Sequence, residues 1–142
     1  MDITEELAER IISLRIATRL PCMCEESGKA LLTLKSKALF LLSKHEKLAP
    51  QEIMSKLRIL KPNMAALAKE LEAEGLIEKA KNIFDRRNIV YSITDAGRNY
   101  VSRRLEHIAR GAAGIFDNQA DYDTMIAKID DVIGFLAFMT VV

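Results

Sequence analysis

The chain has 142 residues and a mass of 16.0 kDa, the size of one domain, and its 49% hydrophobic and 29% charged residues exclude an intrinsically disordered protein. The longest apolar run, residues 134–142, is too short to span a bilayer, and the acidic N-terminus lacks the pattern of a secretory signal, so we expect a soluble, cytoplasmic protein. The net charge is only +1, but residues 33–104 carry 15 basic and 8 acidic side chains, so a basic middle lies between acidic ends.

The first predicted element is a long amphipathic helix from Ile3 to Leu20. Apolar residues recur there at steps of three and four positions, and Pro21 ends or kinks the helix. The boundary within residues 22–32 stays open, because Gly28 either breaks the segment or lies inside a second helix at a cost of about 1 kcal/mol.

Three helices are predicted in the middle of the chain. The first runs from the N-cap Thr33 to about Lys44, with apolar and lysine side chains on opposite faces. Two short helices follow, Pro50 to Leu57 and Pro62 to Glu74, each with proline in the first turn, where its missing N–H costs nothing. Gly75 is suited to the left-handed cap of the second. The tight link of residues 58–61 makes this pair a helix-turn-helix candidate.

The pattern then changes to the period of a β-hairpin. Residues 76–79 and 89–93 are predicted strands, and the link 81–88 between them is mostly polar and basic, which indicates a charged hairpin tip. Thr94 followed by Asp95 is an N-cap signal for a helix that extends to about Arg110.

The C-terminal region is expected to form the interface of a dimer. Residues 111–114, with two glycines, interrupt the preceding helix, and a last helix over residues 121–138 carries apolar residues at helical spacing. Its end, residues 135–139, would leave an apolar patch exposed on a monomer. We therefore expect a homodimer.

Three motifs, in this order and spacing, resemble the MarR family of bacterial and archaeal regulators. The resemblance implies a mainly α fold with a small β-hairpin wing (α+β), that is, a winged helix-turn-helix with N- and C-terminal dimerisation helices. It divides the chain into residues 1–32 for dimerisation, 33–98 for DNA binding and 99–142 for dimerisation. The motifs are Leu71-Glu72-Ala73-Glu74-Gly75-Leu76-Ile77, Asp85-Arg86-Arg87-Asn88 and Ile93-Thr94-Asp95-Ala96-Gly97-Arg98.

The second helix of the pair is the expected recognition helix, and its outer face is poor in base-reading groups. Asn63 and Lys69 are the exposed side chains that can donate to base edges, Ala66 can contact a thymine methyl, and Lys61 can contact a phosphate. A large share of recognition is therefore expected from phosphates and DNA shape. The predicted buried stripe is Met64, Leu67, Ala68 and Leu71, and further phosphate candidates are Lys35, Lys37, Lys56 and Arg58.

The hairpin tip supplies the stronger DNA signal. Asp85 can brace Arg87 across the tip and so orient a long cation before DNA arrives. By resemblance to the family wing, Arg87 is expected in the minor groove and Arg86 at a phosphate. The alternative is a solvated charge run at a loop tip.

Cys22 and Cys24 leave two functional interpretations beside a structural one. They could form a thiol switch, or a soft metal site completed by His45 or His107. The structural interpretation, two small half-buried residues at a helix end, is favoured because the neighbouring Glu25 and Glu26 oppose thiolate formation.

These features predict a DNA-binding transcriptional regulator. We expect a repressor that binds a palindromic operator on double-stranded DNA as a homodimer, and the resemblance implies release by a small aromatic or lipophilic ligand. No cofactor, metal or membrane partner is expected, and an enzyme is disfavoured because no Gly-rich phosphate loop or nucleophile motif occurs. The alternatives are a winged-helix module for protein–protein interaction and a redox regulator that senses through Cys22 and Cys24.

Overall fold

The chain divides into two compact units, Met1–Ile108 and Ala109–Val142. The cysteine pair Cys22 and Cys24, and the hairpin-tip residues Asp85, Arg86 and Arg87, lie outside the described residues. Within the expected N-terminal helix, residues 3–6, 9–10 and 13 are described, and all of them are helical. The computed structural model describes residues 2–6, 9–10, 13, 33–81, 83 and 88–141.

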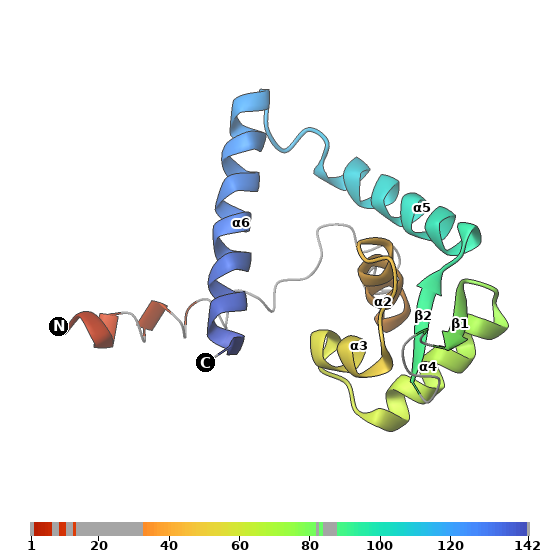
Figure 1. The fold of residues 1–142 in the computed structure, drawn as a ribbon. Coiled ribbons are helices and arrows are strands. Elements are labelled where there is room, and N and C mark those ends of the chain that lie inside the picture. The colour runs from red at the N-terminus through yellow and green to blue at the C-terminus, as the bar shows by residue number, and fades with distance from the viewer. Residues whose placement is uncertain are drawn as a thin grey trace. The chain divides into compact units, whose positions relative to one another are not determined.

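Three helices, α2 (Leu34–Ser43), α3 (Pro50–Leu57) and α4 (Lys61–Ala73), form the centre of the first unit (Figure 1). Thr33 caps α2 by accepting a hydrogen bond from the Ser36 N–H to its Oγ1 at 3.1 Å. Arg58 ends α3 in the left-handed conformation, with φ of 55°, and so produces the sharp turn into α4. The predicted three-helix pattern is confirmed to within about one residue at each end.

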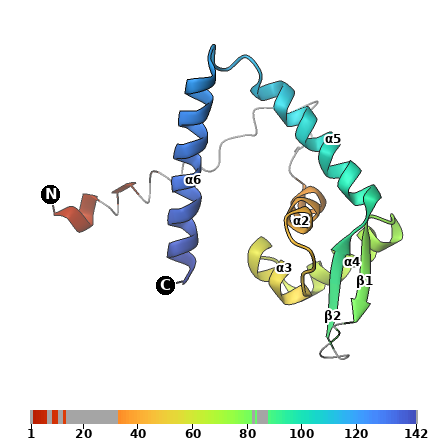
Figure 2. The same ribbon diagram turned by 45° about the horizontal axis from the view of Figure 1, so that its top comes forward.

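The wing is an antiparallel pair of strands, β1 (Ile77–Lys81) and β2 (Ile89–Ile93), in the register Ile77 to Ile93. Figure 2 shows the hairpin beside α4, which contacts β1. A third backbone segment joins the sheet, because Leu48 and Tyr91 exchange N–H···O bonds of 3.0 and 2.8 Å. The mainly helical fold with a small hairpin wing is confirmed.

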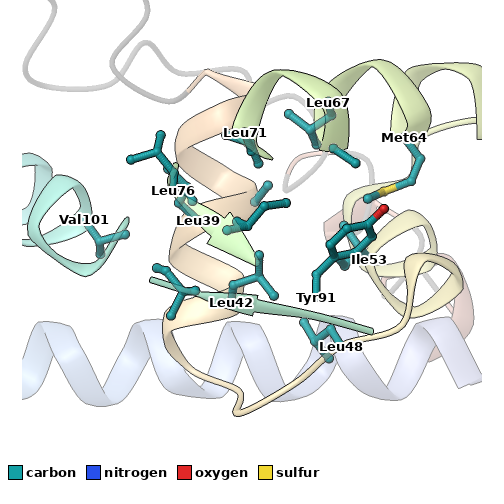
Figure 3. Packing of buried hydrophobic residues seen from close by; sticks show 14 residues of the cluster. Leu39, Leu42, Leu48, Ile53, Met64, Leu67, Leu71, Leu76, Tyr91 and Val101 are labelled. Carbon is teal, nitrogen blue, oxygen red and sulfur yellow. The ribbon is translucent and has the colours of Figure 1, made fainter. Parts of the chain in front are cut away.

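The core of this unit lies between the three helices and the hairpin (Figure 3). Its largest fully buried side chains are Leu39 and Leu42 of α2, Ile53 of α3 and Leu71 of α4. The predicted buried stripe of α4 is confirmed, since none of its members is more than 5% exposed. The opposite face of α4 is therefore held outward by the packing of the core. The buried apolar residues are Ala38, Leu39, Leu42, Leu48, Ile53, Met64, Leu67, Ala68, Leu71, Leu76, Ile77, Tyr91, Ile93 and Val101.

Thr94 joins the end of α4 to the start of α5 (Asp95–Ala112). Its Oγ1 accepts from the Gly97 N–H at 3.1 Å and donates to the Gly75 carbonyl at 2.7 Å, and its own N–H donates to the Leu76 carbonyl at 3.1 Å. Gly75 has φ of +73°, the left-handed conformation that the sequence predicted for it. Two motifs that are separated in sequence thus meet in one hydrogen-bonded junction.

The second unit holds the end of α5 and the helix α6 (Gln119–Val141). Between them Gly114 takes the left-handed conformation with φ of +83°, and Asn118 caps α6 by accepting from the Asp121 N–H at 2.9 Å. The rings of Phe116 and Tyr122 meet edge to face with centroids 5.1 Å apart. The predicted last helix is confirmed, and the predicted interruption is confirmed at Ala113 and Gly114, whereas Gly111 and Ala112, which were expected to interrupt the helix, still belong to α5.

One face of α6 is apolar and exposed within the unit. Its residues recur at steps of three and four, so they form a continuous stripe along the helix. In the described part of the chain, no helix combines the length and the apolar content needed to cross a bilayer. The stripe consists of Met125, Ile126, Ile129, Val132, Ile133 and Leu136.

Candidate nucleic-acid interface

The outer face of α4 presents every residue that the sequence assigned to base or phosphate contact on this helix. Lys61, Asn63, Ala66 and Lys69 are all exposed. The side chains of Lys61, Asn63 and Lys69 make no hydrogen bond or ion pair with the described residues, so their donors are free for a ligand. The face combines three donor side chains with small apolar ones.

The residue before α4 adds an apolar group that the sequence analysis did not consider. Leu60 is the N-cap residue of α4 and is 74% exposed. In a helix-turn-helix the N-terminal residues of the recognition helix approach the base edges. The exposure of Leu60 could not be predicted from the sequence, because a leucine in a short link is ordinarily expected to pack inward.

A groove of about 540 Å³ runs along one flank of α4. Its α4 wall is formed by Asn63, Ala66 and Glu70, which follow one another at steps of three and four. The opposite wall comes from the start of α2 and from α5. The groove therefore brings two predicted DNA-contacting residues, Asn63 and Ala66, next to side chains of other helices. The full lining is Thr33, Leu34, Lys35, Asn63, Ala66, Leu67, Glu70, Tyr100 and Arg104.

Tyr100 is the centre of the polar contacts in this groove. Its hydroxyl lies 3.2 Å from Ser36 Oγ, the Lys35 Nζ lies 5.2 Å from the centroid of its ring, and the Arg104 guanidinium carbon lies 5.3 Å from it. Lys35 also forms an ion pair with Glu74 that links α2 to the end of α4. Tyr100 and Arg104 are one helical turn apart, a spacing that the sequence analysis did not use.

The surroundings of Tyr100 change its acidity. Burial raises the pKa of Tyr100, but hydrogen bonds with Ser36 and Arg104 and the positive charges of Arg104 and Lys35 outweigh burial and hold the pKa below its ordinary value of 10.0. Tyr91 is affected in the opposite direction, because burial, with a smaller contribution from Glu72, raises the pKa of its phenol above 10.0.

The first strand of the hairpin carries further exposed cations. Lys79 and Lys81 are exposed on β1, and Ile83 is 83% exposed just beyond that strand. The expected tip residues Asp85, Arg86 and Arg87 are outside the described residues, as are Cys22 and Cys24. Among the residues that are described, no group of three or more His, Cys, Asp or Glu is placed to hold a metal ion.

A family model described as a winged helix DNA-binding domain matches residues 34–110, more than half of the chain. The chain belongs to this family. The matched residues contain α2, α3, α4, both strands and most of α5, so they include the exposed face of α4 and the whole lining of the groove except Thr33. The family is one of DNA-binding domains.

Solved structures identify the variety of winged helix. The transcriptional regulator BldR from Sulfolobus solfataricus is 19% identical, with 92% of this chain and 99% of BldR covered and a TM-score of 0.62. MarR is 19% identical, with 92% and 97% covered and a TM-score of 0.61. CouR from Rhodococcus jostii RHA1, solved bound to p-coumaroyl-CoA, is 20% identical, with 75% and 73% covered and a TM-score of 0.59. No curated protein matches this winged helix protein. Its fold is that of a MarR-type transcriptional regulator, as the three sequence motifs indicated.

Proposed function

We propose that this winged helix protein is a cytoplasmic transcriptional repressor that binds a palindromic operator as a homodimer. The observation that carries the proposal is the outer face of α4, where Lys61, Asn63 and Lys69 are exposed without partners among the described residues. A recognition helix with free donors fits the major groove of duplex DNA, where donors and acceptors of the bases are accessible.

Dimerisation is supported by the apolar stripe of α6. Its six exposed residues, Met125 to Leu136, form one face, and a second copy of the same stripe would remove both from water. In this proposal residues 1–32 and 99–142 serve dimerisation and residues 33–98 bind DNA. Two recognition helices about 34 Å apart would then enter successive major grooves of a palindromic site.

The wing completes the proposed DNA contact. Arg87 would enter the minor groove, Arg86 would contact a phosphate, and Asp85 would brace Arg87 from the hairpin tip. The exposed Lys79 and Lys81 lie in the half of β1 that leads into the link between the strands, and their positive charges support this assignment. Substitution Arg87→Ala should lower affinity for AT-rich sites more than for GC-rich ones, since minor-groove width depends on sequence.

A salt titration tests DNA binding directly. We expect the affinity for a duplex of mixed sequence to fall steeply with salt, and Lys61→Ala to reduce the slope of log K against log salt by about 0.9, the contribution of one phosphate contact. Lys128→Ala is the matched control, because it removes one positive charge from α6, a helix to which no DNA contact is assigned.

Failure to bind duplex DNA at low salt would exclude the repressor and favour the alternative of a protein–protein interaction module. The alanines on the outer face of α4 are the observation that favours that alternative. If the protein does bind duplex DNA, selection of bound genomic fragments would identify the operator. We expect an inverted repeat with half-sites one helical turn apart.

Release by a small aromatic or lipophilic ligand is also proposed. The solved structure of CouR, a protein of the same fold, holds p-coumaroyl-CoA, which contains an aromatic acyl group. A ligand that binds the free regulator more tightly than the DNA-bound one must lower DNA affinity by the same factor.

The alternative, oxidation of Cys22 and Cys24, predicts that a double Cys→Ser variant no longer loses DNA binding in peroxide.

A further inference from the structure

The groove on the flank of α4 lies next to the proposed base-reading face and shares residues with it. Asn63 and Ala66 belong to both, while Tyr100 and Arg104 of α5 and Lys35 of α2 complete the groove. A recognition helix in the major groove has a phosphodiester strand along each flank, because the groove is bordered by the two backbones. One of these strands must pass over the flank on which this groove lies.

The shape of the groove fits a chain passing through it. Of its nine lining residues only Leu67 is buried, and the others are exposed or half-buried, so the groove is open to solvent along its length. Small-molecule sites are usually concave enough to bury most of their ligand. An open groove in which polar side chains outnumber the apolar Leu34, Ala66 and Leu67 is better suited to a backbone that enters at one end and leaves at the other.

Of the groove's walls, the α5 wall is the one whose charge favours binding of an anion. Glu70 on the α4 wall repels phosphate, and Lys35 is already paired with Glu74. Arg104 has no carboxylate partner among the described residues, and its contact with Tyr100 leaves other N–H donors of the guanidinium free. Arg104 is therefore the group in the groove that can best bind a phosphate.

Tyr100 holds Arg104 in place for this role. The phenol is fixed by Ser36, which is buried, and the Arg104 guanidinium lies against the tyrosine ring. An arginine ordered before binding loses less conformational entropy when it meets a phosphate. Tyr100 is thus a positioning residue, and Arg104 is the contacting one.

We propose that the groove between α2, α4 and α5 binds one strand of the DNA backbone. Arg104, whose guanidinium lies against the Tyr100 ring, would hold one of its phosphates. The inference rests on the proposed DNA binding and extends the interface from the helix-turn-helix and wing to α5. It assigns sequence-independent affinity to a helix that otherwise connects the DNA-binding region to the C-terminal unit.

The first test is a salt titration of full-length variants on one duplex. Arg104→Ala should lower affinity about tenfold at moderate salt and reduce the salt slope by about 0.9, equally on unrelated sequences. Arg104→Lys should restore the slope but only part of the affinity, because the planar fork is lost. Tyr100→Phe, which keeps the ring but loses the hydroxyl, should lower affinity with the slope unchanged.

Arg103→Ala is the matched control. Arg103 is the exposed neighbour of Arg104 on α5 and does not line the groove, so its loss should leave the slope unchanged. Thermal unfolding of each variant identifies any that fails to fold, and Arg104→Gln, which keeps a long polar side chain but removes the charge, then replaces Arg104→Ala in the comparison.

A second test locates the phosphate. Neutral methylphosphonate is placed at one backbone position at a time in a bound duplex, and we expect one position on each half-site where it weakens the wild type but not Arg104→Ala. If Arg104→Ala and Arg103→Ala have the same slope and no such position exists, while Lys61→Ala still lowers the slope, the groove proposal is wrong and DNA binding stands. If no variant changes binding because DNA is not bound, the proposed function itself fails. Binding of a small organic anion in the groove with no phosphate position would also overturn the proposal.

Discussion

Single residues at the junction of α4, the hairpin and α5 explain why one of the family motifs has its particular sequence. Gly97 lies where a Cβ would come within 2.3 Å of the Leu76 carbonyl oxygen and 2.5 Å of Ile93 Cγ1. The first turn of α5 therefore packs directly on the backbone that follows α4. Thr94 closes the same junction with its three hydrogen bonds. The motif is a packing requirement and does not itself contact a ligand.

Replacing Gly97 tests this packing. Gly97→Ala should lower the free energy of unfolding by about 1–3 kcal/mol, because the new methyl group meets backbone that cannot move aside easily. Equilibrium unfolding in urea measures the change. Gly134→Ala in α6 is the control, since nothing lies within 4 Å of its Cβ position, and no such loss is expected there. Equal destabilisation of both variants would contradict the interpretation.

The two tyrosines of the first unit should titrate in opposite directions from the ordinary value of 10.0. Tyr100→Phe should remove phenolate absorbance that develops below pH 10, and Tyr91→Phe should remove absorbance that develops above it. Because the folded pKa of Tyr100 is lowered, its stabilising contribution is present above pH 10 and is lost as the pH falls through the folded pKa. For Tyr91 the folded pKa is raised, so its contribution is present below pH 10 and is lost as the pH rises.

Spectrophotometric titration of the wild type, Tyr100→Phe and Tyr91→Phe checks that Tyr100 ionises before Tyr91. Unfolding measured from pH 8 to 11 checks the signs, with the stability gap between wild type and Tyr100→Phe expected to widen as the pH increases. A gap that narrows over this range would show that the cations around Tyr100 do not favour its phenolate.

At the scale of the element, α4 combines few hydrogen-bond donors with several small apolar side chains on its outer face. Ala65, Ala66 and the preceding Leu60 are exposed beside Lys61 and Asn63. Apolar side chains distinguish bases in the major groove chiefly through the 5-methyl group of thymine. The face therefore favours sites with thymines opposite α4, and the remaining affinity must come from phosphates.

Substituting uracil for thymine tests this interpretation. Each removed methyl group at a contacted position should weaken binding to a selected operator by about 1 kcal/mol, with no change in salt slope. Electrophoretic mobility shift with duplexes that carry uracil at single positions measures the effect. In Leu60→Ala, replacing thymine by uracil at one such position should no longer weaken binding. In Glu72→Ala, a substitution on α4 but outside the groove lining, the same replacement should still weaken it. Uniform insensitivity of the wild type would contradict methyl reading.

At the scale of the whole molecule, the proposed DNA-reading face of α4 belongs to the first unit and the apolar stripe of α6, proposed for assembly, belongs to the second. The first unit has its own core of fourteen buried apolar residues, whereas α6 in the second unit leaves six apolar residues of one face exposed. A partner that covers this face would stabilise the helix, and we propose a second copy of the chain as that partner, because a two-fold interface brings the same patch of both copies together.

One charged substitution in this stripe should separate assembly from folding of the first unit. Ile129→Glu should convert a dimer to monomers, as measured by sedimentation, and should lower operator affinity at least tenfold because the two half-sites are no longer bound together. Ala127→Glu introduces the same carboxylate on the opposite face of α6 and should leave the dimer intact. A dimer that survives Ile129→Glu would place the interface elsewhere.

The sequence alone determined the local elements of this protein and its family. Helix caps such as Thr33 and Thr94, prolines in first turns and the left-handed Gly75 act through their nearest neighbours in the chain, so they can be recognised without tertiary structure. The buried stripe of α4 followed from helical periodicity in the same way. The exposed donors Lys61, Asn63 and Lys69 could be named as the complement of that stripe.

Only the tertiary structure decided what lies beside α4. The groove joins residues of α2, α4 and α5 that are up to seventy positions apart, and neither Tyr100 nor Arg104 has a local pattern that predicts contact with Ser36 or Lys35. The outward position of Leu60 likewise depends on the left-handed turn at Arg58 and the packing of two helices. Local signals specify the backbone because they depend on adjacent residues, whereas side chains from distant segments meet only after the core has fixed how the helices pack.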